Sequence, residues 1–355
     1  SCTLGINSPG VCSPNDTRNM DSLTHTVLGA CAGEALAGRK LGKKAMLWGA
    51  LANNLPDIDV VTSAWMNQAD SLLAHRGFTH SILFAILMTP LLGIWFKRMI
   101  KNDQMSLNNW MLLWGSGMFF HIGIDAMTAY GTGWFEPFSH HRVSFNILFV
   151  ADPFYTISLL IASIALLILK SVNPYRKFWM RFGLLISSVY ILYAFNNKYK
   201  VDKTARKNFL EQNIHEQNYF TTPAPLNNWL WYVLAKTDSG YQMGYYSLFD
   251  KSDHIDFSYS PQQDSLLAPF RNNEEVKKLI RFSQGYYSLE STGDTILLND
   301  LRFGQITDFK NGNGHAVFRY ALNNNVNNDL IIQRGRMEGS GKAALQALIE
   351  RVKGK

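Results

Sequence analysis

Residues 77–96, with the sequence GFTHSILFAILMTPLLGIWF, form a run of 20 residues that contains no Asp, Glu, Lys or Arg. A helix needs about 20 predominantly apolar residues to cross the hydrocarbon core of a bilayer. Three further uncharged runs follow before residue 200, namely 107–124, 153–169 and 182–197. Leu, Ile, Phe and Trp occur on all helical faces of these runs. This favours membrane-spanning helices over the alternative, the buried helices of a soluble core.

The composition agrees with a membrane protein. Of the 355 residues, 47% are hydrophobic and 17% are charged, whereas about 25% of the residues in a typical soluble domain are charged. This composition excludes a disordered chain and argues against an ordinary cytosolic enzyme. The three Cys residues all lie within the first 31 positions, which excludes a disulfide-stapled scaffold and a Cys-based zinc finger.

Two weaker apolar segments, residues 22–38 and 45–55, precede the long runs. Both are rich in Gly and Ala, which suits close helix packing. The sequence leaves open whether they span the membrane or insert only halfway. Residues 1–19 are polar, contain Pro9 and Pro14 and lack the apolar centre of a signal peptide. They are therefore predicted to form a disordered N-terminal extension.

The basic residues are clustered beside the apolar segments. A net charge of +7 fits a nucleic-acid-binding protein or a basic membrane protein. No nucleic-acid motif surrounds the cluster at 198–207, which lies beside an apolar segment, so membrane lipid is the expected partner and no nucleic acid is expected. If all six segments cross the membrane, three clusters share one side, which the positive-inside rule makes cytoplasmic. These clusters lie at 39–44, 97–101 and 170–181, and a fourth, at 198–207, falls on the other side.

The composition changes after residue 208 or so. Short aromatic and β-branched segments alternate there with Asp, Asn, Ser and Gly, as is typical of strands joined by turns. Strands are predicted at 229–234, 241–248, 255–259, 285–289, 295–298 and 316–321, and helices at 274–282 and 342–353. The predicted fold is therefore mainly α. A multi-helix integral-membrane bundle, residues 20–207, precedes a small soluble α+β domain, residues 208–355.

Ionisable residues at the ends of the apolar segments point to function, because such groups are costly near a bilayer. His121 and Asp125, in HIGID, are four residues apart and share one helix face. They can bind one metal ion, or the carboxylate can orient the imidazole. Asp57 and Asp59, in NNLPDID, follow Pro56, which ends the preceding segment. A solvated turn is the alternative interpretation of these two carboxylates.

The densest group of such residues is HRGFTHS, residues 75–81. His75 and His80 do not share a helix face and can converge only across a turn, which Gly77 would permit. Thr79 or Ser81 could cap the helix that follows. The alternative is a pair of histidines that lie at a membrane boundary without a ligand.

If the six segments cross, these His and Asp residues fall with His25 at one membrane face, opposite the basic loops. Imidazole nitrogen and carboxylate oxygen suit a divalent metal, Zn²⁺ first and Mn²⁺ or Fe²⁺ as alternatives, and the set can hold two ions. A metal with an open position lowers the pKa of its bound water to about 7. Asp57 or Asp59 could then accept the proton or bridge the ions, and Arg142 could hold an anionic substrate group.

Several of these stretches resemble one known family. They are MDSLTHTVLG (20–29), NNLPDID (53–59), HRGFTHS (75–81), HIGIDAMTAYGT (121–132) and the PFS…R stretch at 137–142. They resemble an inner-membrane family of metal-dependent hydrolases that includes LexA-regulated members and is distantly similar to zinc-dependent phospholipase C and single-strand nucleases. The resemblance implies a bound zinc cluster. It assigns as candidate ligands His25, Asp57, His80, His121 and Asp125, with His75 as a weaker candidate.

Two functions are therefore expected. The first is a membrane-bound metal-dependent hydrolase that attacks a phosphodiester or ester in a small molecule or a phospholipid. The second is a non-enzymatic membrane protein in which the same residues bind a structural metal or form a polar network, and in which the soluble domain binds a partner. In either case the sequence predicts a multi-pass protein of the bacterial inner (cytoplasmic) membrane, with the site and the C-terminal domain on the extracytoplasmic side. A transporter ranks last because the charges cluster at segment ends.

Overall fold

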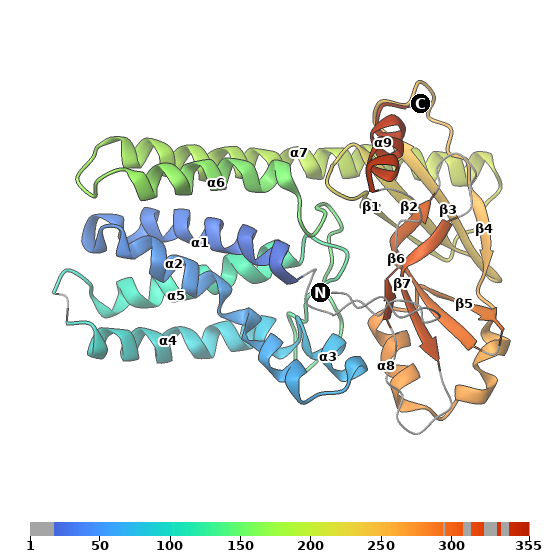
Figure 1. Ribbon diagram of the computed structural model, residues 1–355, viewed down its shortest axis with the longest axis horizontal. Helices are drawn as coiled ribbons and strands as arrows, with labels where there is room; N and C mark the ends of the chain where they lie inside the picture. The colour runs from blue at the N-terminus through green and yellow to red at the C-terminus, as the bar shows by residue number, and fades with distance from the viewer. Residues whose placement is uncertain are drawn as a thin grey trace.

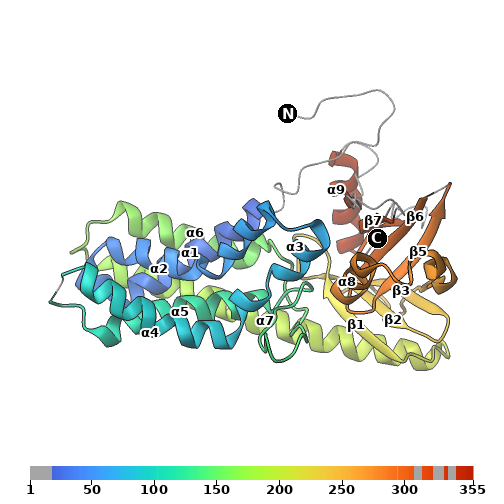
Figure 2. The same ribbon diagram turned by 90° about the horizontal axis from the view of Figure 1, so that it is seen from below.

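The structure, a computed structural model of the chain, describes residues 18–101, 103–293, 295–307, 314–322, 332–334 and 341–354. Most of the N-terminal extension predicted at 1–19 lies outside these residues. A bundle of helices forms one half of the molecule and two β-sheets form the other half (Figures 1 and 2). One long helix runs through both halves, so the two halves share a continuous element.

Six helices of the bundle alternate in direction along its axis (Figure 1). They are α1 (Arg18–Leu41), α2 (Lys44–Asn54), α4 (Ile82–Met99), α5 (Leu107–Asp125), α6 (Pro153–Ile168) and α7 (Tyr175–Glu211). Three short elements join α2 to α4, namely η2 (Pro56–Ala64), α3 (Gln68–Ala74) and η3 (Phe78–His80). These short elements lie at the end of the bundle that faces the sheets, so the segments rich in His and Asp gather there.

Side-chain caps determine where two of these helices begin. The Ser81 hydroxyl accepts a hydrogen bond of 3.0 Å from the backbone N–H of Phe84, so Ser81 rather than Thr79 caps α4. The Asp152 carboxylate accepts a bond of 2.9 Å from the N–H of Phe154 at the start of α6. Such caps satisfy backbone donors that have no partner within the helix.

Glycines allow α1 and α2 to approach each other closely. A Cβ atom on Gly33 would lie 2.1 Å from the carbonyl oxygen of Ala45, and one on Gly49 would lie 2.2 Å from that of Gly29. No side chain fits at such distances, so the two backbones are in direct contact. The close packing that the Gly/Ala-rich sequence predicted is therefore confirmed.

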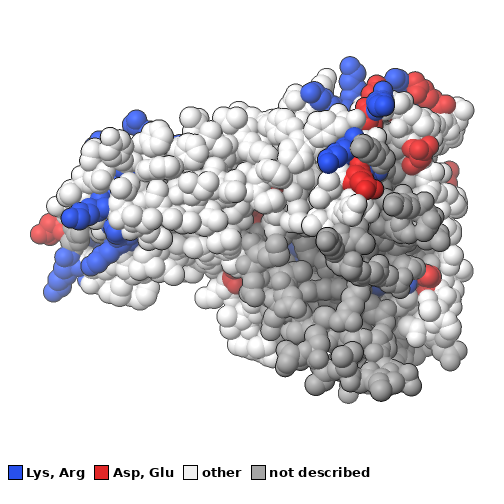
Figure 3. Space-filling view, turned by 45° about the horizontal axis from the view of Figure 1, so that its top comes forward, with Lys and Arg blue, Asp and Glu red and all other residues white. Residues whose placement is uncertain are grey.

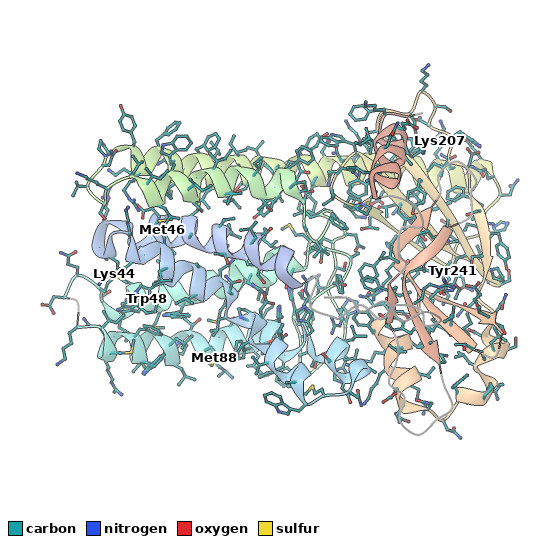
Figure 4. The ribbon with its side chains drawn as sticks, viewed as in Figure 1. Lys44, Met46, Trp48, Met88, Lys207 and Tyr241 are labelled. Atoms are coloured by element: carbon teal, nitrogen blue, oxygen red, sulfur yellow. The ribbon has the colours of Figure 1, made fainter. Side chains whose placement is uncertain are left out.

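Basic side chains gather at the end of the bundle that is far from the sheets. The three helix–helix turns there carry exposed Arg39, Lys43, Lys44, Arg98, Lys101, Lys170, Lys177 and Arg181. Figure 3 shows this basic cluster beside a flank that is almost free of charge. Figure 4 labels Lys44 at this end and Lys207 near the sheets. The three basic clusters thus share one end of the bundle, as the alternation of segments predicted.

Two helices are long and apolar enough to be candidate membrane spans among the described residues. They are α4 and α7. The helix α6 is apolar but has 16 residues. The sequence predicted four long spans, so the multi-pass arrangement stays a prediction.

Two antiparallel four-stranded sheets form the C-terminal domain, in the orders β1-β2-β3-β4 and β5-β6-β7-β8. The strands are β1 (Asn218–Pro223), β2 (Leu230–Lys236), β3 (Gly240–Ser247), β4 (Ser258–Pro261), β5 (Tyr287–Thr292), β6 (Thr295–Thr307), β7 (Gly314–Leu322) and β8 (Ile332–Arg334). Three helical elements accompany them, namely η4 (Asp264–Phe270), α8 (Glu274–Phe282) and α9 (Gly341–Val352). All six predicted strands overlap observed strands, although 255–259 meets β4 only at residues 258–259, and both predicted helices are present. No strand was predicted at β1, which lies at a sheet edge and ends with Pro223, or at β8.

The helix α7 joins the C-terminal domain to the bundle. Its Asn197 amide donates a bond of 3.0 Å to the carbonyl of Asn228, and its Lys198 ammonium donates one of 2.8 Å to the Thr221 hydroxyl. Farther along α7, Phe209 packs among buried side chains of β2 such as Trp231. The domain boundary predicted after residue 207 therefore falls inside a helix that belongs to both parts.

The contact between α1 and α2 can be tested with Gly33→Ala. The added methyl group is expected to lower the free energy of unfolding by about 1–3 kcal/mol, since overpacking forces the helices apart. Gly123→Ala is the matched control, because no atom lies within 4 Å of a Cβ built at that position. The measurement is thermal or denaturant unfolding in detergent. Equal stability of the two variants would contradict the packing described here.

Candidate metal centre

Histidines and carboxylates from four parts of the chain meet at the end of the bundle that faces the sheets. His25 comes from α1, and Asp57 and Asp59 come from the first turn of η2. His75 is the C-cap of α3, His80 ends η3, and His121 and Asp125 lie in the last turns of α5. All seven side chains are described by the structure, and they gather in one place as the sequence predicted.

Asp57, His80, His121 and Asp125 form a compact four-residue group. The Nε2 atoms of His80 and His121 are 3.0 Å apart, and they lie 3.2 and 3.4 Å from Oδ2 of Asp125. Oδ1 of Asp57 lies 3.5 Å from the first Nε2 and 3.4 Å from the second. A tetrahedral ion with bonds of about 2.0–2.1 Å separates its ligand atoms by about 3.4 Å. The four atoms therefore have the spacing of ligands around one cation.

Burial and unsatisfied atoms at this group also fit a cation. His80 and His121 are fully buried and Asp125 is 1% exposed. Among the described residues, Oδ2 of Asp125 has no hydrogen-bond partner. Only one proton fits between the two facing Nε2 atoms, so the lone pair of at least one of them points into the group. A shared cation would satisfy the buried carboxylate oxygen and both nitrogens.

A second group, Asp57, Asp59 and His75, adjoins the first. Nδ1 of His75 lies 3.2 Å from Oδ1 of Asp59, and the three candidate ligand atoms lie within 4.8 Å of one another. This group is more accessible, because the side chain of His75 is 37% exposed and that of Asp57 is 23% exposed. Asp57 belongs to both groups, so the arrangement could hold two cations bridged by this carboxylate.

Asp59 orients the two histidines of the HRGFTHS segment. Its Oδ2 accepts hydrogen bonds of 3.0 Å from the backbone N–H of Arg76 and of 3.1 Å from the Thr79 hydroxyl. The same oxygen lies 3.4 Å from Nδ1 of His80. An outer carboxylate on one ring nitrogen directs the other nitrogen toward a metal. Asp59 thus presents Nε2 of His80 to the four-residue group.

Arg76 occupies the turn that brings these segments together. Its backbone is left-handed, with φ of 58°. Its guanidinium lies 3.1 Å from Oδ1 of Asp125 and donates a bond of 2.8 Å to the Thr128 hydroxyl. The sequence predicted the turn at Gly77. The positive φ falls one residue earlier, and Gly77 is needed because a Cβ there would lie 2.8 Å from the carbonyl oxygen of Ala74.

His25 lies beside the four-residue group rather than inside it. Its Nε2 is 3.1 Å from Oδ1 of Asp125, and its ring centroid is 3.9 Å from that of His121. Since Arg76 and His25 both face Oδ1, the other oxygen of Asp125 remains for the cation. The resemblance described above implied that His25 is a direct ligand, and the geometry favours a supporting position.

Arg142 lies behind the site. Its described hydrogen bonds go to backbone carbonyls, at 2.7 Å to Leu73, 3.0 Å to His75 and 3.5 Å to Gly131. These bonds fix the backbone that carries His75. Burial, with the nearby charges of Arg302 and Arg76, lowers the pKa of Arg142 to about 9. Its predicted role as the holder of an anionic substrate group stays a prediction.

The carboxylates of η2 are held in their ionised form. Burial raises the pKa of Asp57, but the close contacts of this carboxylate with the His121 and His80 imidazoles outweigh that effect and hold the pKa well below its usual range. Burial likewise raises the pKa of Asp59. The interactions of this carboxylate with His75 and His80 are the stronger effect, so its pKa also lies below the usual range. Both groups are therefore charged at neutral pH, as metal ligands and their outer partners must be.

Sequence reasoning missed two residues at this site. Arg76 stood in the conspicuous HRGFTHS segment, but its left-handed turn has no sequence signal in a residue other than Gly, Asn or Asp. Asn53 donates a bond of 2.6 Å to the carbonyl of His25 and so ties α2 to α1. The sequence feature that could have pointed to Asn53 is its position in NNLPDID, close to the two carboxylates.

The helical bundle has two candidate membrane spans and a buried His/Asp cluster at one end. These features are those of a membrane protein with a candidate metal site. The chain belongs to the YdjM inner membrane protein family, whose family model matches residues 20–201. The match ends within α7, so most of the C-terminal domain lies beyond it.

Two relatives are similar to part of the chain. One is the inner membrane protein YbcI of Escherichia coli (strain K12), which is 30% identical over 122 residues, or 34% of this chain and 69% of that protein. The other is the uncharacterised protein YfhP of Bacillus subtilis (strain 168), which is 33% identical over 154 residues, or 40% of this chain. The chain spans 45% of the length of YfhP. No solved structure matches.

Removal of the cation is expected to destabilise the protein. A chelator should lower the thermal unfolding midpoint in detergent, because an ion that binds only the folded state stabilises it by mass action. His121→Ala should make the midpoint insensitive to chelator. His140→Ala is the control, because this exposed ring pairs with Glu136 outside both groups. A wild-type midpoint that does not change on chelation would contradict the metal centre.

Asp59→Asn tests the orienting role of that carboxylate. The affinity for Zn²⁺ is expected to fall by about 10–100-fold, the usual cost of losing an outer partner of a metal ligand. The measurement is competition with a chromogenic chelator. Asp70→Asn serves as the control, because the Asp70 carboxylate pairs with Lys278 and belongs to neither group. An unchanged affinity in Asp59→Asn would exclude the role.

Proposed function

We propose that the protein is a multi-pass inner-membrane hydrolase that uses one or two divalent cations, Zn²⁺ first, to cleave a phosphodiester or ester. The observation that carries the proposal is the pair of adjoining groups that share Asp57. One group is buried and has four candidate ligands. The other has three candidate ligands and is open to solvent at His75 and Asp57. Catalytic metal sites typically combine three protein ligands with an open position.

Within this proposal the residues have distinct tasks. A divalent cation, when bound, supplies a strong nucleophile from water at neutral pH and polarises the bond to be cleaved. With one cation held through Oδ1 of Asp57, the other oxygen of this accessible carboxylate accepts the proton released in the attack. Asp59 holds His75 and His80 in position, and Arg76 with His25 keeps Asp125 ionised and oriented.

The surface of the bundle supports a multi-pass arrangement. Large apolar side chains are exposed along three helices: Ile86, Leu87 and Leu91 on α4; Ile157, Ile161 and Ile164 on α6; and Leu185, Val189 and Leu192 on α7. Apolar faces of this extent suit lipid rather than water. With the basic end of the bundle cytoplasmic, as the positive-inside rule suggests, the metal centre and the sheets lie on the extracytoplasmic side.

Exposed apolar side chains beside the metal centre support a lipid substrate. Ile58 and Val61 lie in η2 and Trp65 is its C-cap, and the three are 55%, 55% and 75% exposed. Phe78, between His75 and His80, is 47% exposed. The elements that carry the candidate ligands therefore also carry side chains suited to the interface of a bilayer, where a phospholipid ester would lie.

A structural role for the metal is the alternative. The four-residue group supplies four protein ligands, as structural zinc sites do, and leaves no open position of its own. In that case the protein is non-enzymatic, and the C-terminal domain binds a partner. Bound metal without turnover of any ester would favour this second function.

Asp57→Asn tests the hydrolase. The protein with bound Zn²⁺ is expected to cleave bis(p-nitrophenyl) phosphate or micellar phosphatidylglycerol. The variant should lose about 10²–10⁴-fold in rate, since its amide cannot accept the proton. Asp103→Asn, in the exposed turn between α4 and α5, is the control. A metal-loaded wild type that cleaves neither compound, or a fully active Asp57→Asn, would overturn the proposal.

A further inference from the structure

A cavity of about 570 Å³ separates the loop that follows α5 from the C-terminal domain. His140, His141 and Arg142 line it from the loop, whereas Arg281 and Arg302 line it from the C-terminal domain. No carboxylate is among the described residues that line it. The cavity is thus a basic site to which both halves of the molecule contribute.

Arg302 is a buried donor with unused capacity. Its side chain is 3% exposed, and its Nε and Nη2 atoms bind the Asp300 carboxylate at 3.0 and 2.6 Å. The rings of Phe282 and Phe303 lie 4.8 and 5.0 Å from its guanidinium carbon. These contacts hold the group rigidly, yet Nη1 has no hydrogen-bond partner among the described residues. A buried donor of this kind is costly unless a ligand satisfies it.

The guanidinium groups of Arg142 and Arg281 add positive charge to the cavity, and nearby carboxylates neutralise only part of it. The described hydrogen bonds of Arg142 are to neutral carbonyls. Arg281 is partly exposed and lies 3.7 Å from Glu136, which also pairs with His140. The lowered pKa of Arg142 reflects, besides burial, the crowding of like charges that include Arg302 and Arg281. Among the described residues, two carboxylates therefore accompany the three guanidinium groups. Asp300 pairs with Arg302, and Glu136 lies near Arg281.

We propose that this cavity binds a phosphate group, held by Arg281 and Arg302 of the C-terminal domain together with Arg142 of the loop. Donors that converge from several elements suit the tetrahedral array of phosphate oxygens, and guanidinium forks bind such oxygens in pairs. The site is separate from the metal centre and does not depend on hydrolase activity. It gives the C-terminal domain, most of which lies beyond the family match, a role in ligand binding.

The test is calorimetric titration of the full chain with inorganic phosphate, in detergent and with a chelator present. One saturable site is expected. Arg281→Gln and Arg302→Lys should each weaken binding by about tenfold, the usual effect of a lost charged hydrogen bond. Lys at 302 keeps the charge opposite Asp300 but removes the free nitrogen, so folding should be retained, which circular dichroism will check. Arg271→Gln, an exposed position on the same domain outside the cavity, should change the affinity less than twofold.

A second arm identifies the source of the phosphate. The chain is reconstituted in nanodiscs with phosphatidylglycerol, and bound lipid is counted by native mass spectrometry. Fewer adducts in Arg281→Gln and Arg302→Lys than in Arg271→Gln would identify a lipid headgroup. Phosphate binding without such a difference would identify a soluble phosphate compound.

Two results would overturn the proposal. One is the absence of saturable phosphate binding together with lipid adducts that are equal in all variants. The other is saturable phosphate binding that both Arg281→Gln and Arg302→Lys leave unchanged, because the phosphate would then lie outside this cavity. Neither result would decide the hydrolase proposal, since that is judged by turnover in Asp57→Asn.

Discussion

The buried carboxylate of Asp125 is the constraint on which the rest of the site depends. An ionised carboxylate with about 1% exposure requires compensating partners on both oxygens, because an unpaired buried charge is strongly destabilising. Oδ1 faces Arg76 and His25, and Oδ2 faces His80 and His121. These partners come from α1, from α5 itself and from the segment between α3 and α4. One side chain thus specifies how three distant parts of the chain converge.

Asp57 and Asp125 belong to one cluster but differ in exposure, and this difference suits them to two tasks, exchange with solvent and retention of a cation. The first is 23% exposed and belongs to both candidate groups, whereas the second is fully enclosed. A buried, fully surrounded ligand favours permanent retention of a cation. A shared and accessible one favours exchange with water or substrate. The same cluster therefore combines features of structural and catalytic sites, and the open side lies at His75.

Much of this arrangement could be predicted from local patterns. The spacing of His121 and Asp125 on one helix face and the alternation of apolar runs with basic loops suffice to bring the His and Asp residues to one end. The left-handed turn at Arg76 could not be predicted, because it depends on a partner, Asp125, that is distant in sequence. Arg302 was equally hidden, since its burial between two rings arises only from tertiary packing. The edge strand β1, NYFTTP, lacked the alternation of apolar and polar residues that identifies a strand.

The helix α7 has a geometric consequence for the whole molecule. At 1.5 Å per residue its 37 residues extend for about 55 Å, well beyond the hydrocarbon thickness of about 30 Å. The surplus length acts as a rigid stalk, because the first sheet, β1 to β4, packs against its far half without an intervening hinge. One residue inserted near the middle of this stalk would rotate everything beyond it by about 100°. The number of residues in this helix therefore determines which face of the C-terminal domain meets the end of the bundle. Insertions would preserve that contact only if they added close to a whole number of helical turns.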